Sequence, residues 1–449
     1  MAGTPPAPKR TRKPHEIALG SRETALSKDH HPLMRFLRIL GPGITVGASD
    51  DDPSGIGTYA VAGASLGYGT LWLAPLTVPL MAAVQYVSAK IGLVTGQGLA
   101  AVLRQHYPRW LVYTVAGSLL VANTINAGAD IGAIGASFNL LWPKLPIGAL
   151  LIPIGLGLLV MQIWGSYKLI AGIFKWLTLA LFAYVAAAFF VHPNWQLVLH
   201  DTLVPQISLK PEYLTTLVAI LGTTISPYML FWQTSQEVEE DIALGRTQLW
   251  QRRGTTRRER RYALIDITVG MFFSNLVMYF IILTTGATLF VSGHHQIGTA
   301  ADAAKALVPM AGRGAEWLLA AGMIGAGALA VPVLTASSAY AVAGALGWKH
   351  SGLSQHPGRA PQFYGIIAAA TLVGIEMNFL GINAVDALYW TAVINGFLAP
   401  LVLTALMLVG GNRKIMGDCT NSILTNVLGW GTTLIMTAAA AALIIFWGK

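Results

Sequence analysis

Apolar runs of about 20 residues recur along almost the whole chain, and they restrict its fold more than any other feature. A helix of that length crosses the hydrocarbon core of a bilayer. Only 11% of the 449 residues are charged and 54% are hydrophobic, whereas about 25% of the residues in soluble domains are charged. The sequence therefore predicts an all-α polytopic membrane protein that is surrounded by a lipid bilayer.

Hydropathy predicts about eleven spans. They cover residues 36–66, 69–92, 110–142, 146–163, 168–191, 213–241, 263–291, 315–346, 362–381, 384–411 and 420–447. Residues 1–34 are polar, basic and proline-containing, and we expect them to form a disordered cytoplasmic tail. Residues 35–449 should form a single transmembrane domain.

Lysine and arginine gather in alternate loops of this scheme. They are densest between the sixth and seventh predicted spans, from Arg246 to Arg261, and they recur at Arg413 and Lys414. The positive-inside rule then places the N-terminus in the cytoplasm and the C-terminus outside the cytoplasmic membrane. Beside so many spans, the arginine-rich loop is expected to meet anionic lipid headgroups, and we predict no nucleic-acid partner.

The first predicted span contains an interruption, GPGITVGASDDDPSGIG over residues 41–57. Asp50, Asp51 and Asp52 precede Pro53, which lacks a backbone donor and disfavours a continuous helix. Carboxylates within a membrane span are costly, so they mark an ion or substrate path. The alternative is a short loop at the membrane surface.

A second interruption follows five spans later, at Pro227 in GTTISPYMLFWQ. Two broken helices at corresponding positions of two halves indicate an inverted-repeat transporter. The first repeat would cover about 36–191 and the second about 213–411, with an extra helix at about 420–447.

At both interruptions, and in the predicted eighth span around AAGMIGAGALAVPVLTASSAYAVAG, the chain resembles the natural resistance-associated macrophage protein (Nramp) family. The family's Asp-Pro-Gly-Asn signature falls on residues 52–55, and its Met-Pro-His signature on residues 226–228. The resemblance implies a LeuT-like fold of five plus five helices and an eleventh, with helices 1 and 6 unwound. It also implies an ion transporter that works by alternating access, and neither an enzyme nor a resident cofactor.

The same resemblance implies that Asp52 is a metal ligand. It further implies that the backbone carbonyls of Ser49 and Thr223 complete the site. Gly55 replaces the family's asparagine, and Ser226 replaces its methionine thioether. Soft sulfur favours soft metals, whereas carboxylate, carbonyl and water suit Mg²⁺ and Mn²⁺. We therefore expect a monomeric secondary active or facilitative transporter of a hard divalent cation.

Coupling residues also depart from the family pattern. The family's two sixth-helix histidines fall on Tyr228 and Gln233, while Asp130 matches an acid of its proton path. Asp50 and Asp51 are additional acids, so carboxylate-based coupling is an open prediction.

The departures leave a second hypothesis open. The cluster from Asp50 to Asp52 would hold Na⁺, and the hydroxyls of Thr223, Ser226 and Tyr228 would hold a small oxyanion such as bicarbonate. Under a third hypothesis, these residues have only structural roles. Asp52 would then cap a helix, and the hydroxyls would satisfy broken backbone.

Overall fold

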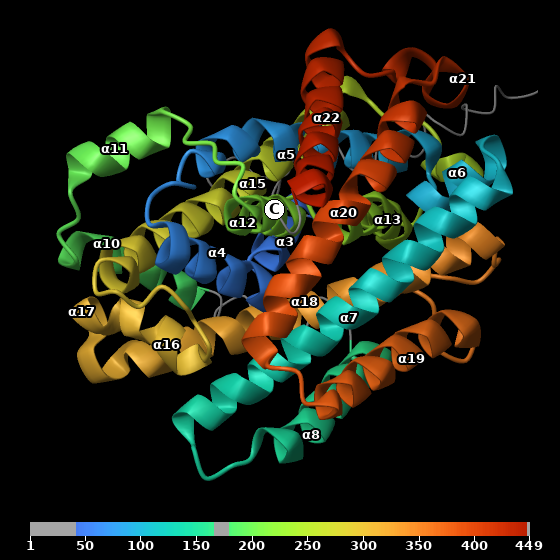
Figure 1. The fold of residues 1–449 in the computed structure, drawn as a ribbon. Coiled ribbons are helices and arrows are strands. Elements are labelled where there is room, and N and C mark those ends of the chain that lie inside the picture. The colour runs from blue at the N-terminus through green and yellow to red at the C-terminus, as the bar shows by residue number, and fades with distance from the viewer. Residues whose placement is uncertain (1–41, 166–178, 447–449) are drawn as a thin grey trace, which may run out of the picture.

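A computed structural model describes residues 42–165 and 179–446, and every regular element within these ranges is helical (Figure 1). The predicted tail, 1–34, and the first part of the predicted fifth span, residues 168–178, lie outside the described residues. The described end of that span contains a 3₁₀ turn, Leu179–Phe182, and α10, Ala183–Phe190.

The first span is broken where its sequence predicts. Helix α3, Pro42–Asp50, is separated by two residues from helix α4, Pro53–Leu66. Asp52 is the N-cap of α4 because its Oδ1 atom accepts a hydrogen bond from the backbone amide of Gly55 at 2.7 Å. Pro53 occupies the first turn, where its missing N–H costs nothing.

The sixth span is broken in the same way. Helix α12, Pro211–Thr224, gives way to α13, Pro227–Ala243, and Pro227 again opens the second segment. Both predicted interruptions are therefore confirmed, each next to a proline that starts a new helix.

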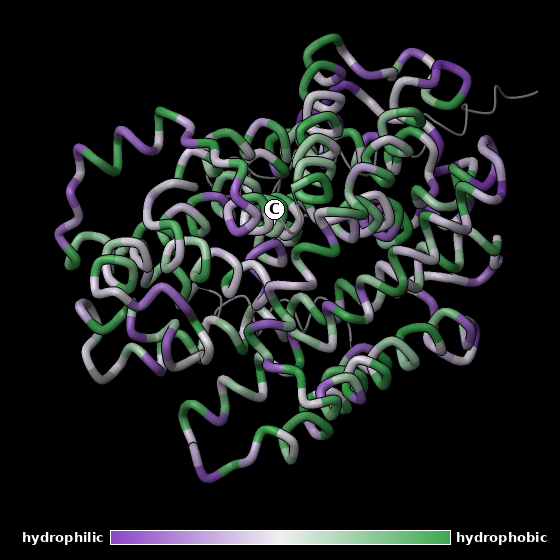
Figure 2. Tube along the Cα trace, in the orientation of Figure 1, coloured by the Kyte–Doolittle hydropathy of each residue, from purple (hydrophilic) through white to green (hydrophobic). Residues whose placement is uncertain are grey.

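Nine apolar helices of the described ranges are long enough to cross a membrane, when α12 and α13 are counted as one. Besides that pair they are α5 (Leu73–Thr95), α7 (Arg109–Leu141), α8 (Ile147–Trp164), α15 (Arg257–Thr285, continued to Phe290), α18 (Ala315–Leu346), α19 (Pro361–Met377), α20 (Ala384–Gly411) and α22 (Ile423–Phe446). Short helices connect them: α6 (Leu99–His106), α11 (Trp195–Leu203), α14 (Leu249–Arg252), α16 (Ala300–Ala304), α17 (Val308–Ala311) and α21 (Arg413–Met416). Figure 2 shows that much of the hydrophilic sequence lies in these connections.

Helix α15 begins six residues before the predicted span at 263. Thr256 and Glu259 form a capping box, in which each side chain accepts a hydrogen bond from the other residue's backbone amide. The capping box starts a helix within a polar, arginine-rich segment. Hydropathy misses this start because it registers only the apolar part of the helix.

Small residues let the helices approach closely. Helix α7 packs along α18, α12 along α20 and α15 along α3 (Figure 1). A Cβ atom added to Gly222 would lie 2.1 Å from the carbonyl oxygen of Ala392 on α20. A Cβ atom on Gly47 would lie 2.4 Å from the carbonyl oxygen of Gly270 on α15. These contacts fix α3 and α12 next to their neighbours up to the two breaks.

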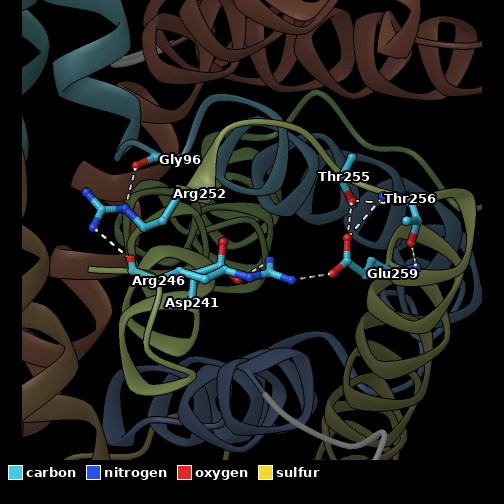
Figure 3. Close-up of polar contacts among 7 residues, drawn as sticks. All are labelled: Gly96, Asp241, Arg246, Arg252, Thr255, Thr256 and Glu259. Atoms are coloured by element: carbon cyan, nitrogen blue, oxygen red, sulfur yellow. Dashed lines mark hydrogen bonds and ion pairs between the residues drawn. The ribbon is translucent and has the colours of Figure 1, made fainter. Parts of the chain in front are cut away.

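A buried ion-pair network joins the end of α13 to the start of α15 (Figure 3). The Arg246 guanidinium lies 2.9 Å from Asp241 and 3.3 Å from Glu259, and all three side chains are almost fully buried. Arg252 donates to the carbonyl oxygen of Gly96, the residue after α5. This part of the arginine-rich loop is therefore bound to protein groups.

Candidate functional site

The two helix breaks face each other, and hydrogen bonds between buried side chains join them. The Ser54 and Thr223 hydroxyls are 3.4 Å apart, and the Tyr59 and Thr224 hydroxyls are 3.0 Å apart. Tyr228, in the first turn of α13, donates its hydroxyl to the carbonyl of Ser49 on α3 at 3.0 Å. The structure thus brings together the predicted residues of both halves.

Asp52 has two different environments for its two oxygens, and its side chain is buried. Its Oδ1 atom caps α4, as described above. Its Oδ2 atom accepts a hydrogen bond from Asn126 Nδ2 on α7 at 3.2 Å. The capping role and a ligand role are therefore compatible, because only one oxygen is used by the cap.

Asn126 was not anticipated from the sequence. It lies four residues before Asp130 on α7, and this spacing puts both polar side chains on one face of an apolar helix. That pattern was the available signal, since polar residues in membrane helices usually face the protein interior.

Asp130 is fully buried, and neither of its carboxylate oxygens has a hydrogen-bond partner of normal geometry. The groups that face it include the Asp52 carboxylate and the backbone amide of Ser54. The structure therefore places the predicted coupling acid beside the predicted ligand.

Asp50 and Asp51 lie on a different side of the break. The Ser274 hydroxyl on α15 donates to Asp50, and at 3.4 Å to Asp51 as well. The second oxygen of Asp50 is buried without a hydrogen-bond partner. Ser274 could not be anticipated from the sequence, because the contact joins residues more than 200 positions apart.

The remaining predicted residues lie on the second half. Ser226 donates its hydroxyl to the carbonyls of Thr223, at 2.6 Å, and Gly222, at 2.9 Å. A Cβ atom on Gly55 would lie 3.3 Å from both Asp52 Oδ1 and the Thr223 hydroxyl, so glycine leaves this space open. Gln233 bonds Glu237 at 3.0 Å, and none of its hydrogen bonds described here reaches the breaks.

The carboxylates of this site have no cationic counterpart within residues 42–165 and 179–446. Asp50, Asp51, Asp52 and Asp130 are all buried, and none of them forms a salt bridge there. The same ranges contain no group of three or more His, Cys, Asp or Glu side chains arranged around one metal position. A cation at the break would therefore depend on one or two carboxylates with carbonyl, hydroxyl and water oxygens.

Comparison with known families decides the identity of this arrangement. The model of the natural resistance-associated macrophage protein-like (Nramp) family matches residues 43–446. The chain belongs to the Nramp family. Members of this family are transporters and not enzymes, so the chain is a membrane transporter, as predicted.

The relatives of this protein align with nearly its whole length. The divalent metal cation transporter MntH of Verminephrobacter eiseniae is 27% identical over 425 residues, which are 92% of this chain and 88% of that protein. The protein of the same name from Yersinia pestis is 26% identical over 434 residues, covering 94% and 98%.

Solved structures give the same fold. A manganese transporter of Eremococcus coleocola superimposes with a TM-score of 0.70 at 20% identity, covering 94% of this chain and 90% of that one. The inward-facing structure of Mhp1 superimposes with a TM-score of 0.52 at 12% identity, covering 90% of each chain. The predicted LeuT-like fold, with helices 1 and 6 unwound, is confirmed.

Proposed function

We propose that this Nramp member transports a divalent metal cation by alternating access, and that Asp52 is its anchoring ligand. One observation carries the proposal: four buried aspartates surround the first break without a cationic partner in the described chain. Buried charges are normally paired or coordinate metals, because an isolated one is very costly. A divalent cation would compensate these carboxylates.

The available ligands favour a hard ion such as Mg²⁺ or Mn²⁺. Asp52 Oδ2 and the carbonyls of Ser49 and Thr223 supply oxygen donors around the breaks. Each carbonyl already accepts a hydroxyl, from Tyr228 or Ser226, but a carbonyl oxygen has a second lone pair. Gly55 and Ser226 add no soft donor, and Mg²⁺ keeps several waters and needs few protein ligands.

The hydrogen bonds weigh against the bicarbonate hypothesis. An oxyanion would need free hydroxyl donors, but Ser226 and Tyr228 already donate to backbone carbonyls. The Thr223 hydroxyl is shared with Ser54. Binding an anion would therefore break these bonds beside four uncompensated carboxylates.

Asp130 is the residue that we assign to coupling by a proton or Na⁺, together with Asp50 and Asp51. Neither of its oxygens has a hydrogen-bond partner of normal geometry, so both can accept a bound proton or Na⁺. Gln233 lies at a family histidine position, but an amide side chain cannot titrate. It would therefore line the coupling path without carrying a proton.

Flux measurements in proteoliposomes test the proposal. Wild type should take up Mn²⁺ or Mg²⁺ without bicarbonate, and Asp52→Asn should lower uptake at least about tenfold, since even indirect metal partners cost that much. Asparagine is still a good N-cap, so the variant should fold. Asp302→Asn, on the partly exposed α16, is the matched control and should transport normally.

Two results would contradict this assignment. Wild-type metal uptake by Asp52→Asn would move the site away from Asp52. Sodium-dependent internal alkalinisation by bicarbonate, without metal uptake by wild type, would replace the cation proposal with the oxyanion hypothesis.

A further inference from the structure

A second polar cluster lies where α5, α15 and the segment before α22 meet. It comprises Tyr86 and Lys90 on α5, Arg260 on α15, and Cys419 and Asn421 before α22. Lys90 Nζ donates to Asn421 Oδ1 at 2.6 Å and lies 5.8 Å from the centre of the Tyr86 ring. Arg260 Nη1 donates to Cys419 Sγ at 2.8 Å. We call these five residues the Lys90–Arg260 cluster.

Charge in this cluster is uncompensated. Lys90 is only 3% exposed, yet neither Lys90 nor Arg260 pairs with a carboxylate anywhere in the described chain. Both cations donate to the same short segment before α22, Lys90 to Asn421 and Arg260 to Cys419, so two like charges lie in one cluster. A buried ammonium beside a guanidinium is therefore an arrangement that an anion would stabilise.

The cluster also has more hydrogen-bond donors than acceptors. Asn421 turns Oδ1 toward the ammonium, and its buried Nδ2 group is left without an acceptor. The Lys90 ammonium carries three N–H donors, and one of them is used in the hydrogen bond to Asn421. The Cys419 thiol is a weak acceptor for Arg260. A ligand that satisfies these donors must bring several negatively charged oxygens.

The position of the cluster makes it accessible to such a ligand. Lys90 lies near the end of α5, Arg260 in the first turn of α15, and Asn421 just before α22. The ends of membrane helices lie at the depth of the lipid headgroups. Arg260, Cys419 and Asn421 are partly exposed. Further exposed cations lie on the same segments: Arg257, Arg261, Arg413 and Lys414.

We propose that the Lys90–Arg260 cluster binds a phosphate group. Phosphate presents several oxygens to ammonium and guanidinium donors, and such charge-assisted hydrogen bonds are among the strongest in proteins. The group can belong to an anionic phospholipid or to free inorganic phosphate. This site is separate from the cation site at the helix breaks and independent of the ion that the protein transports.

Cys419 provides a direct probe, because it is the only cysteine of the 449 residues. A phosphate at Arg260 would cover its thiol. We would measure maleimide labelling of the full chain in nanodiscs of phosphatidylcholine alone, with added phosphatidylglycerol, or with added inorganic phosphate. Phosphate binding should slow labelling by a factor of 1 + [L]/Kd, which is about tenfold when the phosphate compound is present at about ten times its Kd. Protection by phosphatidylglycerol alone identifies a lipid headgroup, and protection by inorganic phosphate identifies the free ion.

Protection is measured within each variant as the ratio of the labelling rates without and with phosphate. Lys90→Gln and Arg260→Gln should each abolish this protection. Lys414→Gln removes an exposed cation of the same region and should keep it. No protection of wild type in any lipid or buffer, or wild-type protection in both glutamine variants, would overturn the site. If Lys90→Gln does not fold, Arg260→Gln decides alone, with native mass spectrometry of retained phospholipid as a second measurement.

Discussion

Ser226 is the residue whose chemistry most separates this chain from the family pattern. Its hydroxyl is bound to two carbonyls of the preceding turn, and its side chain is buried beside the break. Ser226→Met should release those carbonyls and add a soft thioether. We expect Cd²⁺ to gain affinity relative to Mg²⁺ by about tenfold, equivalent to roughly 1.4 kcal/mol.

Isothermal titration of both metals checks this expectation. Ser226→Ala is the matched control, because it frees the same carbonyls without adding sulfur. Equal Cd²⁺ affinity in both variants would show that the thioether does not reach the ion. Loss of bicarbonate flux in both, with no metal binding, would instead support the oxyanion hypothesis.

Some residues of the site could be predicted from the sequence and others could not. Asp52 and Pro53 predicted the first break because a cap and a first-turn proline are local signals. Asn126 and Ser274 could not be identified because their partners are distant in sequence. Hydropathy does not single them out either, because it averages one polar residue with its apolar neighbours. The roles of Asp50 and Asp51 also depended on such a partner, so the sequence left them open.

At the scale of helices, the contact between α12 and α20 should tolerate no side chain at Gly222. A Cβ atom there would lie 2.1 Å from one backbone oxygen and 2.3 Å from the Gly396 amide nitrogen. Gly222→Ala should destabilise the protein by about 1–3 kcal/mol, the usual cost of overpacking. Gly117→Ala, at an exposed α7 position with no atom within 4 Å, is the control. Thermal unfolding in detergent should show a lower Tm for Gly222→Ala only, and equal values would mean that the two helices separate at no cost.

The link between α13 and α15 depends on Arg246, which is buried between Asp241 and Glu259 (Figure 3). Arg246→Ala would leave both carboxylates buried without this partner, at a cost of about 3–5 kcal/mol. Lys305→Ala removes a pair with Asp302 in which the side chains are 51% and 30% exposed, and should cost at most about 1 kcal/mol. Chemical denaturation followed by tryptophan fluorescence compares the two. A similar small loss in both would show that Arg246 is dispensable for stability.

Nine of the eleven predicted spans are long apolar helices of the described residues, since lipid-spanning segments carry a strong local signal. The start of α15 and the network at Arg246 did not follow from hydropathy, because a capping box and buried ion pairs occur in a segment that hydropathy reads as polar loop. Asp241, at the acidic end of α13, pairs with Arg246 of the arginine-rich loop. Glu239 instead bonds Tyr340 on α18, a contact that only the folded chain reveals.

For the whole molecule, the distribution of cations predicts a cytoplasmic N-terminus. The eleven predicted spans then put the segment at Cys419, between the tenth and eleventh, on the cytoplasmic side, and α11, between the fifth and sixth, outside. A membrane-impermeant maleimide should therefore label Cys419 in inverted vesicles but not in intact cells. Gln196→Cys in a Cys419→Ser background, at an exposed position of α11, should be labelled in intact cells.

The paired positions make this test independent of thiol reactivity, because each thiol is compared with itself on the two sides of the membrane. Reversed labelling at both positions would mean an inverted orientation. It would also place the arginine-rich loop and the Lys90–Arg260 cluster outside, away from the anionic cytoplasmic leaflet. Labelling of both thiols from the same side would mean that the number of spans between them is even. In that case one of the predicted spans from the sixth to the tenth, which separate α11 from Cys419, would not cross the membrane.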